Sequence, residues 1–125
     1  MQKSPTNIKL RKTSRLLEVH YDETIFTFPH EYLRVHSPSA EVQGHGPGQE
    51  VLQYGKEEVS VTAIEPVGHY AIRLIFNDQH NSGIFSWDYL FDLGQNMQSN
   101  WLKYLARLEQ AGHKRFPQEN DKYFK

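Results

Sequence analysis

The chain has 125 residues, of which 38% are hydrophobic and 13% aromatic. This length fits one domain of roughly 100–200 residues, and the aromatic content excludes a chain that is disordered throughout. Cysteine is absent, which excludes disulfide bonds, thiolate-held zinc or iron–sulfur centres and a cysteine nucleophile. No apolar run approaches the roughly 20 residues that cross a bilayer, and residues 1–12 lack an apolar signal core. We therefore expect a cytoplasmic protein without membrane contact.

The net charge of −1 is unevenly distributed along the chain. Residues 1–15 contain five basic and no acidic side chains, whereas residues 16–111 contain five basic and 13 acidic ones. Residues 112–125 are basic again, with four basic and two acidic side chains. An acidic body repels a phosphate backbone, so we expect no nucleic-acid partner. Short basic ends are typical of solvated termini, although residues 1–15 could contact an anionic partner.

The first third of the chain alternates polar and apolar residues, which predicts β-strands. Residues 7–12 favour a short edge strand, and residues 16–21 and 25–28 favour a hairpin. Pro29 ends the third strand because it cannot donate a ladder hydrogen bond, but it is tolerated where a helix begins. Residues 30–35 are therefore predicted as a helical turn.

The middle of the chain contains one irregular segment followed by a predicted meander of strands. Residues 37–49 have no hydrophobic period and are rich in glycine and proline, which predicts a loop. Strands are predicted at residues 59–64, 71–76 and 83–86, with a polar turn at 77–82.

The pattern then becomes helical. A helical turn is predicted at residues 87–91, interrupted by Gly94, and a longer helix from a Ser99 cap to Ala111, stopped by Gly112. Its predicted inner face consists of Trp101, Leu102, Tyr104, Leu105 and Leu108. The expected fold is therefore α+β: an antiparallel β-sheet of hairpins with short helices and a C-terminal amphipathic helix. We expect one domain over residues 7–112, with flexible tails at residues 1–6 and 113–125.

Seven histidines make a metal site the first chemical candidate. Asp78 and His80 stand two apart in the predicted polar turn, a spacing that places both side chains on one face of an extended segment. With a distant His36 or His45, they could bind iron or zinc. The alternative is that Asp78 and His80 only shape the turn, where such residues are favoured for backbone reasons.

Other catalytic patterns are missing. The loop Gly44-His45-Gly46-Pro47-Gly48 lacks the spacing and lysine of a nucleotide-binding loop, and no serine stands in a GxSxG motif. A loop this long without its own secondary structure is more often functional or mobile than inert. A binding role for this loop therefore remains, beside a role in tight backbone packing.

Three stretches in combination resemble a known family. They are FPHEYLRV at 28–35, SPSAEVQGHGPGQ at 37–49 and FNDQHNSGIFSWDYL at 76–90. They resemble the γ-butyrobetaine hydroxylase-like N-terminal domain family, including its short bacterial stand-alone members of unknown function. The resemblance covers about residues 7–95.

The resemblance implies a zinc site that this sequence does not retain. In the eukaryotic hydroxylases the domain holds zinc through three cysteines and one histidine and precedes an iron- and 2-oxoglutarate-dependent catalytic domain. Here Ser37, Ser39 and Val42 stand where those cysteines would be, and only His80 matches a ligand. Similar domains fused to ATPases that resemble iron–sulfur cluster carriers imply an accessory role beside metal-dependent proteins.

Two functions remain open. The first is a non-catalytic accessory module, a monomer or weak dimer, that binds another protein through segment 37–49 and turn 78–82, because exposed loops on a rigid scaffold often bind partners. Its expected contact residues are Ser37, Ser39, His45, Gly46, Gly48 and Gln49. The second is a protein ancillary to iron–sulfur or iron-dependent enzymes that binds iron or zinc through His80, Asp78, and His36 or His45. We expect no catalytic residues, because no oxygenase domain accompanies the resemblance.

Overall fold

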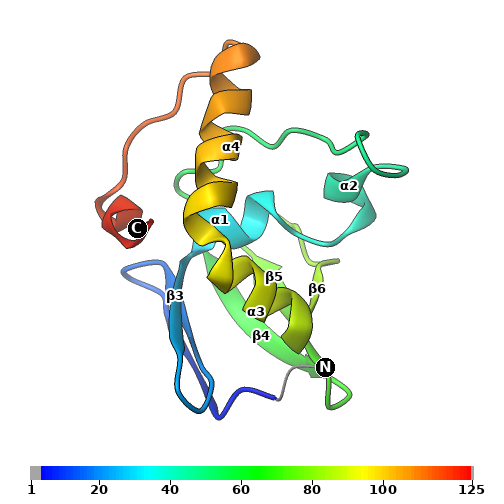
Figure 1. The fold of residues 1–125 in the computed structure, drawn as a ribbon, viewed down its shortest axis with the longest axis vertical. Helices are drawn as coiled ribbons and strands as arrows, with labels where there is room; N and C mark the ends of the chain where they lie inside the picture. Colours follow the sequence, from blue (N-terminus) through cyan, green and yellow to red (C-terminus); the bar gives the residue numbers. More distant parts are fainter. Residues whose placement is uncertain (1–3, 125) are drawn as a thin grey trace.

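The computed structural model describes residues 4–124, which form two three-stranded antiparallel sheets and four α-helices (Figure 1). The first sheet contains β1 (Asn7–Arg11), β2 (Leu16–His20) and β3 (Ile25–Pro29), and the second contains β4 (Val61–Val67), β5 (Ala71–Phe76) and β6 (Ile84–Ser86). The helices are α1 (His30–Val35), α2 (Ala40–Gln43), α3 (Trp87–Gln95) and α4 (Met97–Gln110), followed by the 3-10 helix η1 (Glu119–Tyr123). The predicted α+β class is confirmed, with the hairpins divided between two sheets.

The alternation of β2 fixes the first sheet. Leu17 and Val19 are fully buried, and Leu17 lies opposite Leu10 of β1 and Phe28 of β3. Because side chains alternate between the two faces of a strand, a shift by one residue would expose this row of apolar side chains. The predicted hairpin of residues 16–28 is therefore held in one register.

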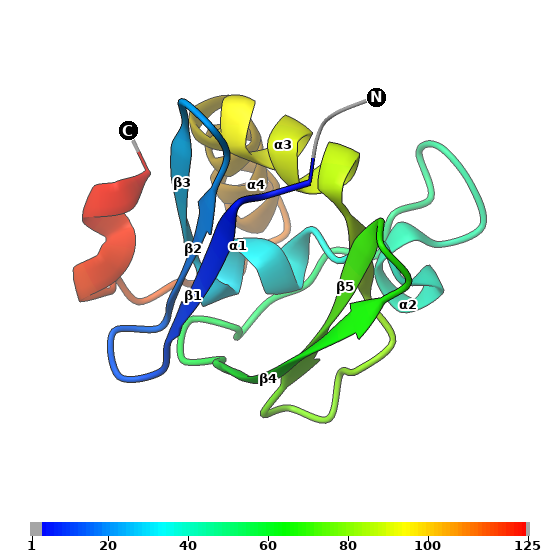
Figure 2. The same cartoon turned by 90° about the horizontal axis from the view of Figure 1, so that it is seen from below.

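Helix α1 lies between the two sheets and joins them (Figure 2). All six of its residues are buried, and the Tyr32 hydroxyl donates a hydrogen bond to the Leu93 carbonyl at 2.7 Å. The Val61 amide of β4 donates to Nδ1 of His30 at 3.0 Å. Burial lowers the pKa of His30 to about 4, so this imidazole is neutral at pH 7 and its unprotonated Nδ1 accepts the bond.

Strand β4 runs farther than predicted, from Val61 to Val67 instead of from residue 59 to 64, and it includes Pro66. Proline is tolerated here because β4 is at the edge of the sheet order β4–β5–β6. The strand therefore continues through Pro66, past its predicted end at residue 64.

Helix α3 ends at Gln95, one residue beyond Gly94, where the sequence predicts its interruption. A Cβ at Gly94 would overlap the ring of Phe26 on β3. The glycine therefore permits close approach of α3 to the first sheet. Helix α4 begins at Met97, before the predicted cap Ser99.

The buried face of α4 consists of Met97, Trp101, Tyr104 and Leu108. Leu102 was expected on this face, but its exposed fraction is 59%. A spacing of three residues drifts around a helix of 3.6 residues per turn, and the two aromatic residues determine which face is buried. Gly112 has φ +77 just after the helix, as its predicted role at the C-terminus requires.

The expected C-terminal tail packs against the rest of the protein. Arg115 donates hydrogen bonds to both carboxylate oxygens of Glu31 on α1, at 2.9 and 2.7 Å, and to both of Asp121. The ring of Phe124 stacks on Trp101 of α4 with centroids 3.8 Å apart. An ion pair with α1 and an aromatic pair with α4 therefore hold this segment in the structure, and the boundary at residue 112 stays a prediction.

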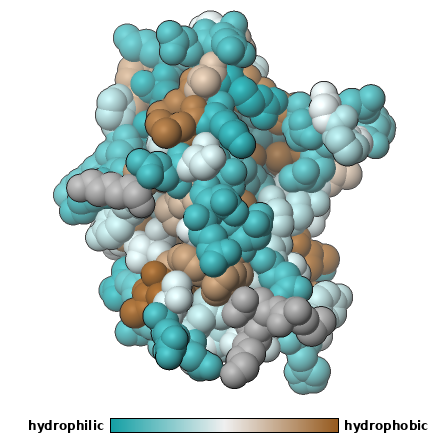
Figure 3. All heavy atoms as spheres, viewed as in Figure 1, coloured by the Kyte–Doolittle hydropathy of each residue, from teal (hydrophilic) through white to brown (hydrophobic). Residues whose placement is uncertain are grey.

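The expected N-terminal tail lies partly outside the described residues, which begin at residue 4. Thr6 hydrogen-bonds to the carbonyl of His20 through its amide at 2.6 Å and its hydroxyl at 3.1 Å, so it extends the pairing of β1 with β2. Figure 3 shows a mainly hydrophilic surface on one face, with apolar side chains in small separate patches. Within residues 4–124 there is no helix of the length and apolarity that a bilayer span requires.

Candidate functional site

The chain after α1 is fixed against the turn that follows β5. Ser37 is fully buried and Ser39 nearly so. A Cβ at Gly83 would overlap the Ser37 hydroxyl, so this glycine allows the turn to approach segment 37–49 closely. Residues 40–43, predicted as part of a loop, form the short helix α2. Two segments that the sequence separates are thus packed together.

The side chain of His80 connects the two segments. Its Nε2 lies 2.9 Å from the Ser37 hydroxyl and 3.3 Å from the Ser39 hydroxyl, and its Nδ1 lies 3.2 Å from Oε2 of Glu41. We call these four residues the His80 cluster. Burial, aided by the nearby charge of Arg34, lowers the pKa of His80, so the imidazole is neutral at pH 7. A carboxylate can only accept, which assigns the proton to Nδ1 and lets Nε2 accept from Ser37.

Asp78 does not face the imidazole of His80. Its Oδ2 accepts hydrogen bonds from Arg34 Nε at 2.9 Å and Lys56 Nζ at 2.8 Å, while its Oδ1 accepts from the His80 amide at 3.3 Å. Burial alone would raise the pKa of Asp78, but the hydrogen bonds from Lys56 and Arg34 outweigh it and hold that pKa below its usual value. Asp78 therefore joins α1 to the turn and caps the backbone of the turn.

The other two predicted metal ligands lie elsewhere. His36 hydrogen-bonds through Nδ1 to the Tyr32 carbonyl at 2.9 Å and lies beside the Tyr32 and Tyr104 rings. Burial lowers the pKa of His36 as well. His45 is exposed on the outer loop. Across residues 4–124, no three histidine, aspartate or glutamate side chains come together in a metal-binding group.

The zinc site that the family resemblance implies does not fit the side chains at these positions. The donor set would be two neutral hydroxyls, of Ser37 and Ser39, one imidazole, of His80, and the apolar Val42. Zinc sites in proteins use thiolate, imidazole and carboxylate donors in a tetrahedral set. The hydroxyls instead hydrogen-bond to the imidazole, which is the role that the buried polar groups here require.

Sequence reasoning missed Glu41 and Arg34. Glu41 continues the two-residue spacing Ser37, Ser39, Glu41, which was a usable signal for a shared face. Arg34 had no such signal, because only the packing of α1 against the turn places its guanidinium beside Asp78.

The outer part of segment 37–49 is a loop of defined shape. Gly44 has φ +71, and a Cβ there would overlap the Gln49 carbonyl. The Gln49 amide donates to the Gly46 carbonyl at 3.0 Å. A hollow of about 350 Å³ is lined by residues 43–47 and Glu50. A second hollow of about 300 Å³ lies next to it, between residues 50–53 and α4. The predicted contact residues thus divide into a buried pair, Ser37 and Ser39, and the loop residues His45, Gly46, Gly48 and Gln49.

Comparison with known proteins places this arrangement in a family. Residues 8–91 match the model described as gamma-butyrobetaine hydroxylase-like, N-terminal. A protein with an NMR solution structure is 49% identical, with 95% of this chain and 94% of that chain covered and a TM-score of 0.81. A second NMR structure is 46% identical, with coverages of 93% and 87% and a TM-score of 0.78.

A crystal structure of a protein with unknown function from Acidithiobacillus ferrooxidans, of the DUF971 family, is also similar. It is 39% identical, with 73% of this chain and 92% of that chain covered, and its TM-score is 0.61. No curated protein matches the chain. The matched residues include α1, segment 37–49 and the turn that carries His80, and the chain belongs to the gamma-butyrobetaine hydroxylase-like, N-terminal family.

Proposed function

We propose that this chain is a non-catalytic accessory module that binds another protein through segment 37–49 and turn 78–82. The observation that carries the proposal is the His80 cluster. It joins Ser37 to His80, which are 43 residues apart in sequence, and so connects segment 37–49 to turn 78–82. Ser37, Ser39 and His80 are buried and hydrogen-bonded to one another, while the exposed Glu41 contacts the other ring nitrogen of His80. These bonds support the proposal that the cluster holds segment 37–49 in place.

The form of the loop supports recognition. Loops held on a rigid scaffold are frequent binding elements, and a preformed loop loses less conformational entropy on binding than a mobile one. Here Gly44 and the Gln49–Gly46 hydrogen bond fix the loop, while His45 and Gln49 remain exposed for contact. The hollows beside the loop offer space for side chains of a partner.

Affinity purification with matched histidine variants tests this proposal. His45→Ala and Gln49→Ala remove exposed side chains from the loop, and His69→Ala removes an exposed histidine from the turn before β5. We expect one partner to be retained by the wild type and by His69→Ala, and to be reduced about tenfold by the double variant His45→Ala, Gln49→Ala, as the loss of about 1.4 kcal/mol of binding free energy implies. Equal retention of every captured protein by the wild type and both variants contradicts the proposal.

The alternative that the chain binds iron or zinc through His80, Asp78, and His36 or His45 stays a prediction. It would require Asp78 to release Arg34 and Lys56, with which it pairs here. An anaerobic titration with zinc and then ferrous iron, followed through imidazole NMR shifts, tests it. Saturable shifts of His80 that weaken below about pH 6, where imidazoles become protonated, would support a metal site. Absence of saturation would leave the accessory module.

A further inference from the structure

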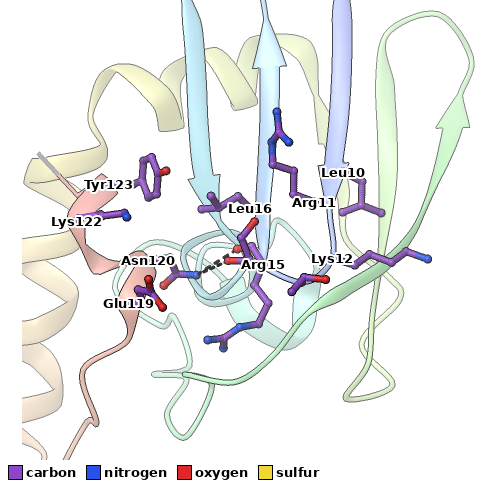
Figure 4. A pocket seen from close by; sticks show the side chains of 11 residues that line it. Leu10, Arg11, Lys12, Arg15, Leu16, Glu119, Asn120, Lys122 and Tyr123 are labelled. Atoms are coloured by element: carbon purple, nitrogen blue, oxygen red, sulfur yellow. Dashed lines mark hydrogen bonds between the residues drawn. The ribbon is translucent and has the colours of Figure 1, made fainter.

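A pocket of about 580 Å³ lies between the β1–β2 hairpin turn and η1 (Figure 4). This volume is in the range of roughly 300–1,000 Å³ of small-molecule sites. It is at the other end of the molecule from α2, as both ribbon views show (Figures 1 and 2). Its lining consists of residues 10–16 from the hairpin and Glu119, Asn120, Lys122 and Tyr123 from η1. It shares no residue with the proposed protein-binding surface.

The pocket brings together the two basic ends of the chain. Residues 1–15 and 112–125 carry the excess of positive charge, and the acidic body lies between them in sequence. The hairpin turn and η1, which form the two walls, belong to these two segments. The lining contains four basic side chains and one acidic side chain, that of Glu119. The basic side chains are those of Arg11, Lys12, Arg15 and Lys122. The fold thus concentrates positive charge that the sequence leaves dispersed.

Arg15, which lines this pocket, is held in one conformation by its hydrogen bonds. Its φ of +57 is unusual for a residue other than glycine. Its guanidinium donates to the Glu57 carbonyl at 2.6 Å and to the Gln118 side chain at 2.8 Å, and its carbonyl accepts from Asn120 at 3.3 Å. A left-handed residue persists when its surroundings over-determine it, and such residues cluster at functional sites. This left-handed residue therefore lies at the pocket and is held there by Glu57, Gln118 and Asn120.

Two lysines of the lining form no ion pair with another described residue, and Nζ of one of them, Lys122, lies 5.7 Å from the ring centroid of Tyr123. Arg11 is engaged by Glu18, and Arg15 by the contacts above. Among residues 4–124, no carboxylate forms an ion pair with Lys12 or Lys122. Figure 4 shows Lys122 extending from η1 toward the hairpin, while Lys12 stands at the rim and points away from η1. Lys122 therefore faces the pocket directly, and Lys12 reaches it by rotation of its flexible side chain.

We propose that this pocket binds a small molecule that carries a phosphate group beside an apolar portion. Lysine ammonium groups bind phosphate as point charges, and the hydroxyls of Thr13 and Ser14 on the same turn add hydrogen-bond donors. The apolar portion packs against Leu16 and the ring of Tyr123, which line the pocket on either side. An anion with no apolar part would lack the contacts with Leu16 and Tyr123.

Phenyl phosphate is the probe, and the amide NMR shifts of residues 10–16 and 119–123 are the readout. We expect saturable shifts at both walls, weaker binding of inorganic phosphate and no shifts with phenol. In the double variant Lys12→Gln, Lys122→Gln the dissociation constant should rise about tenfold or more, as the loss of charge-assisted hydrogen bonds implies. The matched control is Lys103→Gln on α4, which should bind like the wild type.

Amide spectra that match the wild type outside the pocket establish that each variant is folded. Shifts that stay linear in phenyl phosphate, or an unchanged dissociation constant in the double lysine variant, overturn the proposal. Equal binding of phenyl phosphate and inorganic phosphate overturns the assignment of the apolar portion. Because the pocket and segment 37–49 share no residue, failure here leaves the protein-binding proposal unaffected.

Discussion

His80 shows how much a single buried side chain can contribute to this fold. Its two ring nitrogens contact Ser37, Ser39 and Glu41, and its exposed fraction is 2%. Alanine at this position removes the partner of two buried hydroxyls and leaves a cavity. We expect a loss of about 2–4 kcal/mol in the free energy of unfolding. Urea denaturation measures it.

The control for this variant is His45→Ala, because His45 is exposed on the loop. It should change the free energy of unfolding by less than about 0.5 kcal/mol, the range of ordinary surface substitutions. Equal losses for His80→Ala and His45→Ala would show that the His80 cluster does not hold the two segments together.

We expect the buried His30 to make the folded protein less stable in acid. Burial lowers its pKa in the folded protein to about 4 from an ordinary value of 6.5. Between these values the unfolded chain binds a proton that the folded protein does not, so stability falls as the pH decreases from 6.5 toward 4. The full effect is about 3 kcal/mol. Burial also lowers the pKa of His36 and His80, which adds in the same direction.

His30→Asn isolates this effect, because an asparagine amide oxygen can accept from the Val61 amide but does not titrate. Urea denaturation from pH 4 to pH 7 should give a smaller slope of stability against pH for the variant than for the wild type. Parallel curves would contradict the assignment of His30 as a neutral buried acceptor.

At the scale of elements, Gly94 places helix propensity and packing in opposition. Alanine is the better helix former by about 1 kcal/mol, so propensity alone predicts that Gly94→Ala stabilises α3. A Cβ there would overlap the Phe26 ring, so packing predicts a net loss of about 1–3 kcal/mol. We expect packing to prevail, as measured by urea denaturation.

A double-mutant cycle checks the cause. In a Phe26→Ala background the ring is absent, and Gly94→Ala should then be neutral or stabilising. If Gly94→Ala costs the same with and without the Phe26 ring, close approach of α3 to the sheet is not the reason for this glycine.

Local patterns predicted most of the elements, because a strand or helix with one buried face repeats its apolar residues at a characteristic spacing. The hairpin of residues 16–28 and strand β5 follow from alternation alone. They missed what depends on distant contacts: Gly94 fits the Phe26 ring, and Leu102 is exposed because Trp101 and Tyr104 determine the buried face of α4. Sequence spacing holds no information on such contacts.

The sequence indicated which segments form the candidate site, but not which side chains hydrogen-bond to one another there. Segment 37–49 and turn 78–82 were identified from the sequence, and the structure packs them together. The partners of His80 and Asp78 depend on the position of α1 and could not be derived from spacing. His80 and Asp78 stand two positions apart in the chain but belong to different hydrogen-bond networks. His80 contacts the serines, and Asp78 pairs with Arg34 and Lys56.

At the scale of the whole molecule, Arg115 closes the chain by linking its C-terminal segment to α1. Its exposed fraction is 11% and that of its partner Glu31 is 4%. Alanine at position 115 leaves the Glu31 carboxylate buried without its cation, and we expect a loss of about 3 kcal/mol in the free energy of unfolding. Urea denaturation measures this loss, and the same measurement on the double variant Glu31→Gln, Arg115→Ala tests its cause.

Neutralising Glu31 in the Arg115→Ala variant should restore part of the lost stability, because an amide is less costly to bury unpaired than a carboxylate. If the double variant Glu31→Gln, Arg115→Ala is no more stable than Arg115→Ala alone, the ion pair does not hold the segment.

The most direct test of the central claim is an NMR footprint of a captured partner on this chain. With the purified partner added, the account predicts amide shift changes over residues 37–49 and 78–82, and a loss of these changes in the double variant His45→Ala, Gln49→Ala. His69→Ala should give the wild-type footprint. A footprint on η1 and the β1–β2 turn, or one that the loop variants leave unchanged, would contradict the claim that the loop above the His80 cluster is the protein-binding surface.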